Sequence, residues 1–189
     1  SSFFLIILSL SAVAVLIYAK GYIKPYLGRK SPAQISLHYC GLGILYLSML
    51  LVVTLRDGFS FLFAWEVMTL SSFVLMLFDA ERREVRRAAL SYLILMHVGF
   101  LFLLAGFVTL YASGLPASFD ALALYGEQGG NIIPLFIVFL IGFGMKAGIF
   151  PLHVWLPEAH PAAPAHISAF MSGVMIKTGV YGVMRVVSC

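Results

Sequence analysis

The chain contains six apolar stretches, each long enough to cross a lipid bilayer as a helix, and they constrain its fold more than any other feature. They occupy residues 3–19, 37–55, 59–78, 88–112, 132–150 and 167–187. A spanning helix needs about 20 predominantly apolar residues. None of the stretches alternates with the period of two that is typical of a membrane β-barrel. The sequence therefore predicts an all-α membrane protein, a bundle of about six transmembrane helices in a single transmembrane domain.

The positions of the charged residues predict the orientation of this bundle. Charged residues make up only 11% of the chain, and the net charge of +4 does not indicate a nucleic-acid partner because the basic residues gather in loops. Arg56 and Arg185 lie on one side. The first and third loops, on the other side, hold eight: Lys20, Lys24, Arg29, Lys30, Arg82, Arg83, Arg86 and Arg87. Positive loops face the cytoplasm, so we expect a multi-pass protein of the inner (plasma) membrane with these loops inside.

The sequence gives no sign of a bound cofactor or of a catalytic centre of its own. Cys40 and Cys189 have no neighbours typical of metal sites, and we interpret both as packing residues. The chain has no CxxC motif, no glycine-rich nucleotide loop after a strand and no haem-ligand arrangement. It opens almost directly into a span, without an evident signal peptide, and ends where another span could continue. We therefore interpret it as an internal piece of a larger protein.

Glu66 lies near the middle of the third apolar stretch. A charge at the centre of a bilayer costs about 2.5–3.5 kcal/mol, so such residues usually have a function. Thr69 and Ser72 follow at three-residue steps and place a narrow polar stripe beside it. A structural glutamate bonded to a neighbouring helix is one interpretation. A carboxylate that faces a hydrated interior and has a cationic partner is the one we favour.

His97 lies near the centre of the fourth stretch. A histidine in a span can make a hydrogen bond between helices, or it can relay protons because its charge changes near neutral pH. Both interpretations stay open.

Two lysines lie on either side of a proline-rich segment between the last two spans. Pro151 follows Lys146 by five residues and predicts a break or kink in the helix. Non-helical backbone at membrane depth is tolerated only where protein or a water-filled cavity covers it. We therefore expect Lys146 to face an internal wet space. Lys177 lies in the middle of the last span.

Three histidines, His153, His160 and His166, follow the expected break. Their spacings of seven and six residues fit no usual zinc pattern, so we expect no metal site. His166 precedes Lys177 by eleven residues, which places both on nearly the same helix face about 16 Å apart. The three histidines thus join Glu66, His97 and the two lysines as candidate residues for proton translocation.

Three segments carry a resemblance to a known family: FAWEVMTLSSFVL around Glu66, SYLILMHVGFLFL around His97, and KAGIFPLHVWLPEAHPAAPAHISAFMSGVMIKTGVYGVMR from Lys146 to Arg185. They resemble the antiporter-like membrane subunits shared by respiratory complex I, Mrp-type cation/proton antiporters and membrane-bound hydrogenases. The sequence is most similar to the large membrane subunits of formate hydrogenlyase and hydrogenase-4. The resemblance is specific from about Phe59 onward.

The resemblance implies roles for three residues. Glu66 matches the mid-membrane glutamate of the family, and Lys146 matches the lysine at the helix break that pairs with it. Lys177 matches the lysine on the following helix, which hands a proton toward a second half-channel. In the family these helices form the first of two inverted repeats, an architecture common among transporters. The chain would hold that first repeat and one preceding helix.

The function expected from these residues and the resemblance is that of a proton-translocating membrane subunit of a redox-driven complex, of the hydrogenase or NADH:quinone oxidoreductase type. Redox chemistry would belong to other membrane and peripheral subunits, and this subunit would be non-catalytic. The alternative is a subunit of a multisubunit Na⁺/H⁺ antiporter of the Mrp type, because the same motifs occur there. A purely structural scaffold would be expected to lose Glu66, Lys146 or Lys177, and all three are present.

Overall fold

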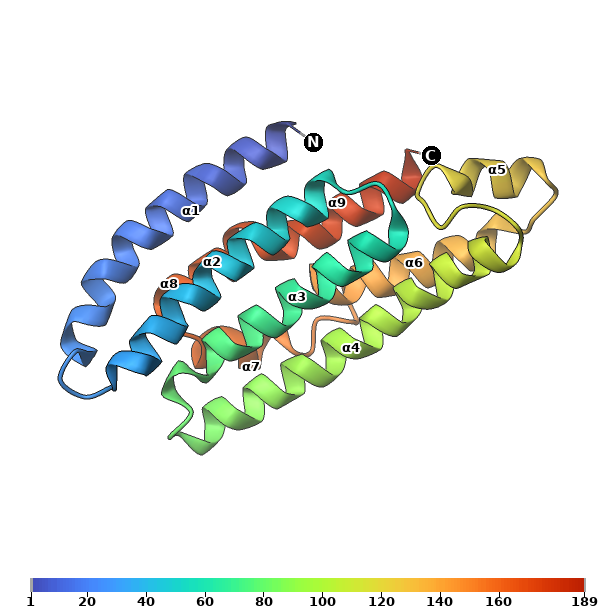
Figure 1. Cartoon of the computed structure of the whole chain (residues 1–189). Helices are drawn as coiled ribbons and strands as arrows, with labels where there is room; N and C mark the ends of the chain where they lie inside the picture. The colour runs from blue at the N-terminus through green and yellow to red at the C-terminus, as the bar shows by residue number, and fades with distance from the viewer. Residues whose placement is uncertain (1, 189) are drawn as a thin grey trace.

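The computed structural model describes residues 2–188, and every regular element within that range is a helix. Figure 1 shows the helices as long, nearly antiparallel rods. The elements are α1 (Ser2–Ile23), the short 3₁₀ turn η1 (Lys24–Tyr26), α2 (Pro32–Thr54), α3 (Gly58–Met76), the 3₁₀ turn η2 (Leu77–Asp79), α4 (Arg83–Ala112), α5 (Ala121–Glu127), α6 (Ile132–Ala147), α7 (Leu156–Ala162), α8 (Ala165–Phe170), the π-helical segment η3 (Met171–Met175) and α9 (Ile176–Val187). The all-α class expected from the sequence is confirmed.

Polar residues at the loop boundaries fix where several helices begin. Ser31 caps α2 through a capping box with Gln34, and Pro32 occupies the first turn, where its missing N–H does no harm. Asp57 caps α3 by accepting a 2.7 Å hydrogen bond from the Ser60 backbone N–H, which holds the pKa of this carboxyl below its ordinary value. Asn131 caps α6 in the same way. The apolar stretches thus become helices bounded by short polar turns.

Five helical stretches are long and apolar enough to cross a membrane: residues 2–26, 32–54, 58–79, 83–112 and 165–187. The protein is therefore a multi-pass membrane protein. The stretch expected at 132–150 differs, because α6 has 16 residues and ends at Ala147. At 1.5 Å per residue it is about 24 Å long, shorter than the hydrocarbon core of about 30 Å. The chain therefore leaves helical geometry inside the membrane.

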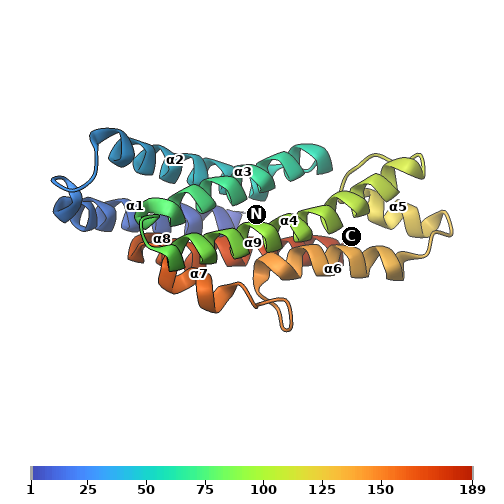
Figure 2. The same ribbon diagram turned by 90° about the horizontal axis from the view of Figure 1, so that it is seen from below.

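The central helix α3 packs between α2 and α4, and α6 packs between α4 and α9. Helix α1 stands at the edge of the bundle and contacts α2 and α8, as Figure 2 also shows from below. The short helix α7 runs beside α4, so the segment after the break turns back into the bundle. This arrangement surrounds the end of α6 with α3, α4 and α9.

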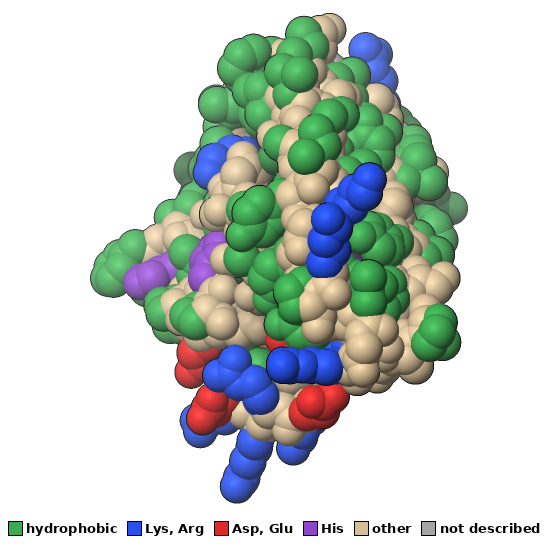
Figure 3. All heavy atoms as spheres, turned by 90° about the vertical axis from the view of Figure 1, so that its left-hand side faces the viewer, with side chains coloured by type: hydrophobic (Ala, Val, Ile, Leu, Met, Phe, Trp, Pro, Cys, Tyr) green, Lys and Arg blue, Asp and Glu red, His purple; other side chains and the backbone are tan. Residues whose placement is uncertain are grey.

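The first and third loops meet at one end of the bundle. Lys30 forms ion pairs with Glu81 at 2.8 Å and with Asp79 at 3.7 Å. The ammonium lowers the pKa of the Glu81 carboxyl. Figure 3 looks at this end and shows Lys and Arg side chains gathered with Asp and Glu.

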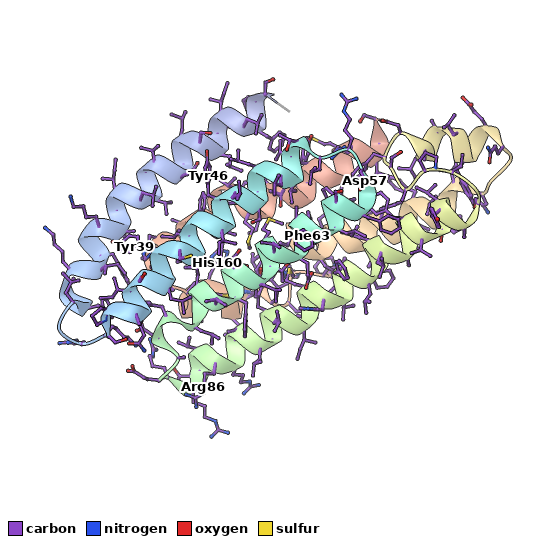
Figure 4. The ribbon with its side chains drawn as sticks, viewed as in Figure 1. Tyr39, Tyr46, Asp57, Phe63, Arg86 and His160 are labelled. Carbon is purple, nitrogen blue, oxygen red and sulfur yellow. The ribbon has the colours of Figure 1, made fainter. Side chains whose placement is uncertain are left out.

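The second and fourth loops meet at the opposite end. Asp57 and Ser118 form an isolated backbone bridge, and Arg185 near the end of α9 donates a 2.6 Å hydrogen bond to the Leu55 carbonyl. Figure 4 shows Asp57 and Arg86 at opposite ends. The helices therefore alternate in direction as the charge distribution predicts.

The charge distribution predicts which end faces the cytoplasm. Cysteines introduced at Gly28 and Glu127, both exposed at opposite ends, are expected to react with an impermeant thiol reagent from opposite sides of the membrane, Gly28 from the cytoplasmic side. The measurement compares labelling of right-side-out and inverted vesicles, with Cys40→Ser and Cys189→Ser as the background. Labelling of both positions from one side would contradict the topology.

Candidate functional site

The helix break lies directly after the turn that carries Lys146. Helix α6 is capped by Gly148 in the left-handed conformation at φ +66°, where a side chain would be strained. The backbone then stays non-helical until α7, and Pro151 lies inside this segment. Trp155, fully buried, donates a 2.8 Å hydrogen bond from Nε1 to the Met145 carbonyl. The break predicted at Pro151 is thus present, but it begins three residues earlier at Gly148.

Lys146 is buried, with only 1% of its surface exposed. Its Nζ donates to Thr69 Oγ1 at 2.9 Å and to the Tyr92 hydroxyl at 3.3 Å. The Trp65 and Tyr92 rings lie 5.6 and 5.7 Å from Nζ, within the range of cation–π attraction. The ammonium group is thus held by neutral oxygens and aromatic faces from α3 and α4.

The hydrogen bonds around Lys146 run in one direction. Thr69 donates its hydroxyl to the Trp65 carbonyl, and Ser72 donates its hydroxyl to the Thr69 carbonyl. The Tyr92 hydroxyl lies 2.7 Å from Ser72 Oγ and 3.9 Å from Met175 Sδ, so its proton points to one of these atoms and its oxygen accepts from Lys146. Each oxygen that faces Lys146 therefore offers a lone pair, so Lys146 supplies the protons of these contacts.

Helix α9 closes the other side of this site. A Cβ added to Gly179 would lie 2.6 Å from the Ala147 nitrogen and 2.8 Å from the Phe143 carbonyl oxygen. Only glycine permits this approach, so the backbone of α9 touches the last turn of α6. The position of Lys146 is therefore fixed from α3, α4 and α9 together.

Glu66 has His97 of α4 as its partner. The distance from Glu66 Oε1 to His97 Nε2 is 2.7 Å, and beyond this contact neither carboxylate oxygen has a hydrogen-bond partner among residues 2–188. His97 Nδ1 lies 2.9 Å from the Leu93 carbonyl oxygen, which can only accept, so Nδ1 carries a proton. A contact of 2.7 Å then requires one further proton between the ring and the carboxylate. It gives either an imidazolium–carboxylate pair or a neutral imidazole with a carboxylic acid.

The direct pairing of Glu66 with Lys146 that the resemblance implies is not formed in this structure. Glu66 contacts His97, and Lys146 contacts Thr69 and Tyr92. Glu66 and Thr69 are three residues apart on α3, so the two groups lie about one helical turn from each other. Glu66 and the Thr69 hydroxyl that holds Lys146 therefore lie on the same face of α3, and the two proton-binding groups are neighbours.

Lys177 points away from this cluster. Its side chain is exposed, and Nζ donates a 2.5 Å hydrogen bond to the Ser172 carbonyl of the π-helical segment. The adjacent Thr178 faces inward and bonds the Met175 carbonyl at 2.6 Å. Segments of π-helix occur frequently at functional sites. Lys177 thus lies on the outer surface of the described helices, at mid-height of its span.

The three histidines after the break contact different parts of the molecule. His153 packs beside Phe150 at 5.6 Å between ring centres, and its Nδ1 is buried without a partner among the described residues. His160 Nδ1 lies 2.8 Å from Ser168 Oγ, which ties α7 to α8, and partial burial lowers its pKa. His166 reaches His38 of α2 at 2.7 Å. No three residues with metal-ligating side chains gather in the part of the chain that the structure describes.

Three participants were not identified from the sequence. Trp65 and Tyr92 look like ordinary packing residues of apolar helices, and no spacing in the sequence marks the Tyr92 hydroxyl as a partner of a lysine. His38 was not among the candidate residues, and it is 4% exposed and contacts His166. A polar group on one helix identifies its partner only when the packing of the other helices is known.

Residues 56–189 match the family described as NADH:quinone oxidoreductase/Mrp antiporter, transmembrane region. The chain is 32% identical to hydrogenase-4 component B of Escherichia coli strain K12 over 186 residues, which is 98% of this chain and 27% of that protein. It is 31% identical to a putative antiporter subunit of Staphylococcus saprophyticus over 195 residues, 100% of this chain and 23% of that protein.

A solved structure has the same arrangement of helices. One chain of the membrane-bound sulfane sulfur reductase, an archaeal respiratory membrane complex, superimposes with a TM-score of 0.75 and is 29% identical over 98% of this chain and 28% of that chain. The chain thus spans about a quarter of the length of the relatives that it matches.

Proposed function

Because the chain belongs to the NADH:quinone oxidoreductase/Mrp antiporter membrane family, we propose that it forms the first proton-translocating unit of a larger membrane subunit. In this proposal the protons move through Glu66, His97, Lys146 and Lys177, with His153, His160 and His166 on the cytoplasmic side. The helix break at Gly148 and Pro151 supplies the irregular backbone around Lys146. The larger protein would belong to a redox-driven complex whose other subunits carry out the redox reaction.

The observation that carries this proposal is the buried Lys146 near a Glu66–His97 contact of 2.7 Å. An ammonium group at this depth without a carboxylate contact is costly to keep charged. How firmly Lys146 holds its proton therefore depends on where the nearby negative charge lies. When Glu66 is neutral or bound to His97, Lys146 is stabilised less than when the carboxylate turns toward it. Such a pair of neighbouring sites can load and release a proton.

Two polar groups on the outside of the described helices support the view that more protein covers them. His97 has 45% of its side chain exposed, and Lys177 is exposed at membrane depth. Polar groups at such depth almost always face protein or a water-filled cavity. We therefore propose that further parts of the full-length protein or neighbouring subunits cover these two faces.

The redox-driven and the antiporter functions predict different results in vesicles. If the full-length protein works in a redox-driven complex, addition of the redox substrate to inverted vesicles is expected to acidify the interior without a sodium gradient. The measurement follows a pH-sensitive dye together with substrate consumption. Acidification that requires an imposed Na⁺ gradient and ignores redox substrate would favour the antiporter function. The hydrogenase-4 component and the putative antiporter subunit match this chain with nearly the same identity, so this experiment is needed.

Lys177→Ala is expected to leave the complex assembled but largely uncoupled. Lys177 makes its hydrogen bond to its own helix, so its removal breaks no contact between helices. Redox turnover would continue in part while the protons translocated per turnover fall by about tenfold, less than the factor of about 100 that a positioned proton-transfer group often contributes. Unchanged pumping per turnover would show that Lys177 is structural. Lys20→Ala, an exposed lysine near the cytoplasmic loop, is the matched control.

A further inference from the structure

Two buried histidines are in contact near the end of the bundle that carries the basic loops. His38 of α2 and His166 of α8 are 4% and 1% exposed, and their Nε2 atoms are 2.7 Å apart. They are 128 residues apart in the sequence, so only the folding of the bundle brings them together. Nothing in the Lys146 site uses His38.

Aromatic side chains enclose this pair. Phe78 lies 4.6 Å from the His38 ring, and Tyr22 and Tyr18 of α1 lie 4.9 and 6.5 Å from the His166 ring. Such rings exclude bulk water from the contact between the two imidazoles. A proton that crosses this layer by this route must therefore use the imidazole nitrogens.

A surface hollow reaches each member of the pair. His38 lines a hollow of about 240 Å³ between α2 and the end of α3, together with Gln34 and Phe78. His166 lines a separate hollow of about 430 Å³ between α1 and α8. His166 Nδ1 is buried and has no hydrogen-bond partner among the described residues. A neutral histidine has one N–H. His166 Nδ1 is therefore either a bare nitrogen without a donor or an N–H group without an acceptor, and both are unusual for a buried ring.

We propose that His38 and His166 form a proton-relay dyad that passes protons from the hollow beside His38, at the cytoplasmic end, to the hollow beside His166 between α1 and α8. Two Nε2 atoms at 2.7 Å must share one proton, because two bare nitrogens or two N–H groups would repel each other at this distance. The inference rests on the proposed proton-translocating function and extends it with an entrance built by α2, a helix that lies before the family match at residues 56–189.

The transfer balances without any other reactant than water. At the start His38 carries its proton on Nε2 and His166 carries its proton on Nδ1. A proton from cytoplasmic water binds His38 Nδ1, the His38 Nε2–H bond breaks as an Nε2–H bond forms on His166, and His166 Nδ1 releases its proton to water in the hollow between α1 and α8. Both rings are neutral before and after the step, so no net charge stays in the apolar layer. The step leaves His38 protonated on Nδ1 and His166 on Nε2, so both rings must turn before the next proton can pass in the same direction.

The test measures proton uptake by the full complex in inverted vesicles, with redox turnover followed in the same sample. His38→Gln and His166→Gln keep a polar group near Nε2 but cannot relay, and each is expected to lower protons translocated per turnover by about tenfold. His38→Ala is expected to lose uptake in the same way and to regain it when imidazole is added to the outer medium. Tyr39→Phe removes a hydroxyl beside His38 on the exposed side of α2 and is expected to pump normally (Figure 4).

Normal pumping by both glutamine variants would overturn the dyad, and so would a loss in assembled His38→Ala that imidazole fails to restore. A Lys146→Met variant run in parallel separates this result from the proposed function. If Lys146→Met is inactive while the histidine variants pump normally, only the dyad is wrong. If Lys146→Met also pumps normally, the proposed function fails as well.

Discussion

Replacing Lys146 with methionine is expected to abolish proton translocation while the protein stays inserted and assembled. Methionine fills a similar volume, and Lys146 contacts neutral oxygens rather than a carboxylate in this structure, so its replacement leaves no opposite charge without its partner. Thr69 and Tyr92 lose a donor but keep their other hydrogen bonds, to the Trp65 carbonyl and to Ser72. Without an amine the site cannot bind a proton, so translocation is expected to fall by about 100-fold.

Dye quenching in vesicles measures this loss, and blue-native electrophoresis of the complex checks assembly. Lys24→Met is the matched control, because Lys24 is exposed in the turn after α1 and contacts no group of the site. Lys146→Arg tests whether this position needs a proton that can be released or only a positive charge. Arginine keeps the charge but does not release its proton in proteins, so it is expected to be as inactive as methionine. Translocation by the arginine variant would mean that a fixed charge suffices at this position.

Much of the fold follows from the sequence because a spanning helix needs only length and apolar composition. The five long helical stretches overlap five of the expected ranges, although the first continues to residue 26 and the second begins at residue 32, and the alternation of the loops follows the basic residues. The fifth expected range, 132–150, differs because a single glycine, Gly148, can adopt the left-handed conformation that ends a helix. Nothing in hydropathy separates this glycine from Gly144, one turn earlier, which stays helical.

The candidate site could be predicted in part. Glu66, Thr69 and Lys146 are recognisable because polar groups are rare in apolar helices. In the structure Thr69 accepts a hydrogen bond from Lys146. Which polar groups touch depends on the rotation and depth of each helix, and one residue changes the direction of a side chain by about 100°. For this reason the sequence did not predict that His97 contacts Glu66 or that His38 contacts His166.

The Glu66→Gln variant is expected to lose most proton translocation without loss of folding. Glutamine keeps the size of the side chain and can accept from His97, but it cannot carry a negative charge toward Lys146 or take up a proton. In the proposed mechanism the carboxylate alternates between His97 and Lys146 and thereby sets how firmly Lys146 holds its proton. We expect translocation to fall by about 100-fold and the amount of assembled protein to stay near normal.

The His97→Gln variant and the double variant decide whether Glu66 and His97 act as one unit. If the two side chains share a single proton, removal of either disables the same step, and the double variant is expected to be no worse than Glu66→Gln alone. Independent roles would multiply the two losses. A static ion pair behaves differently again, because Glu66→Gln would then lower stability while transport by the assembled protein stays near normal. The ratio of translocation to assembled protein separates these cases. Near-normal transport by well-assembled Glu66→Gln would exclude the alternating carboxylate.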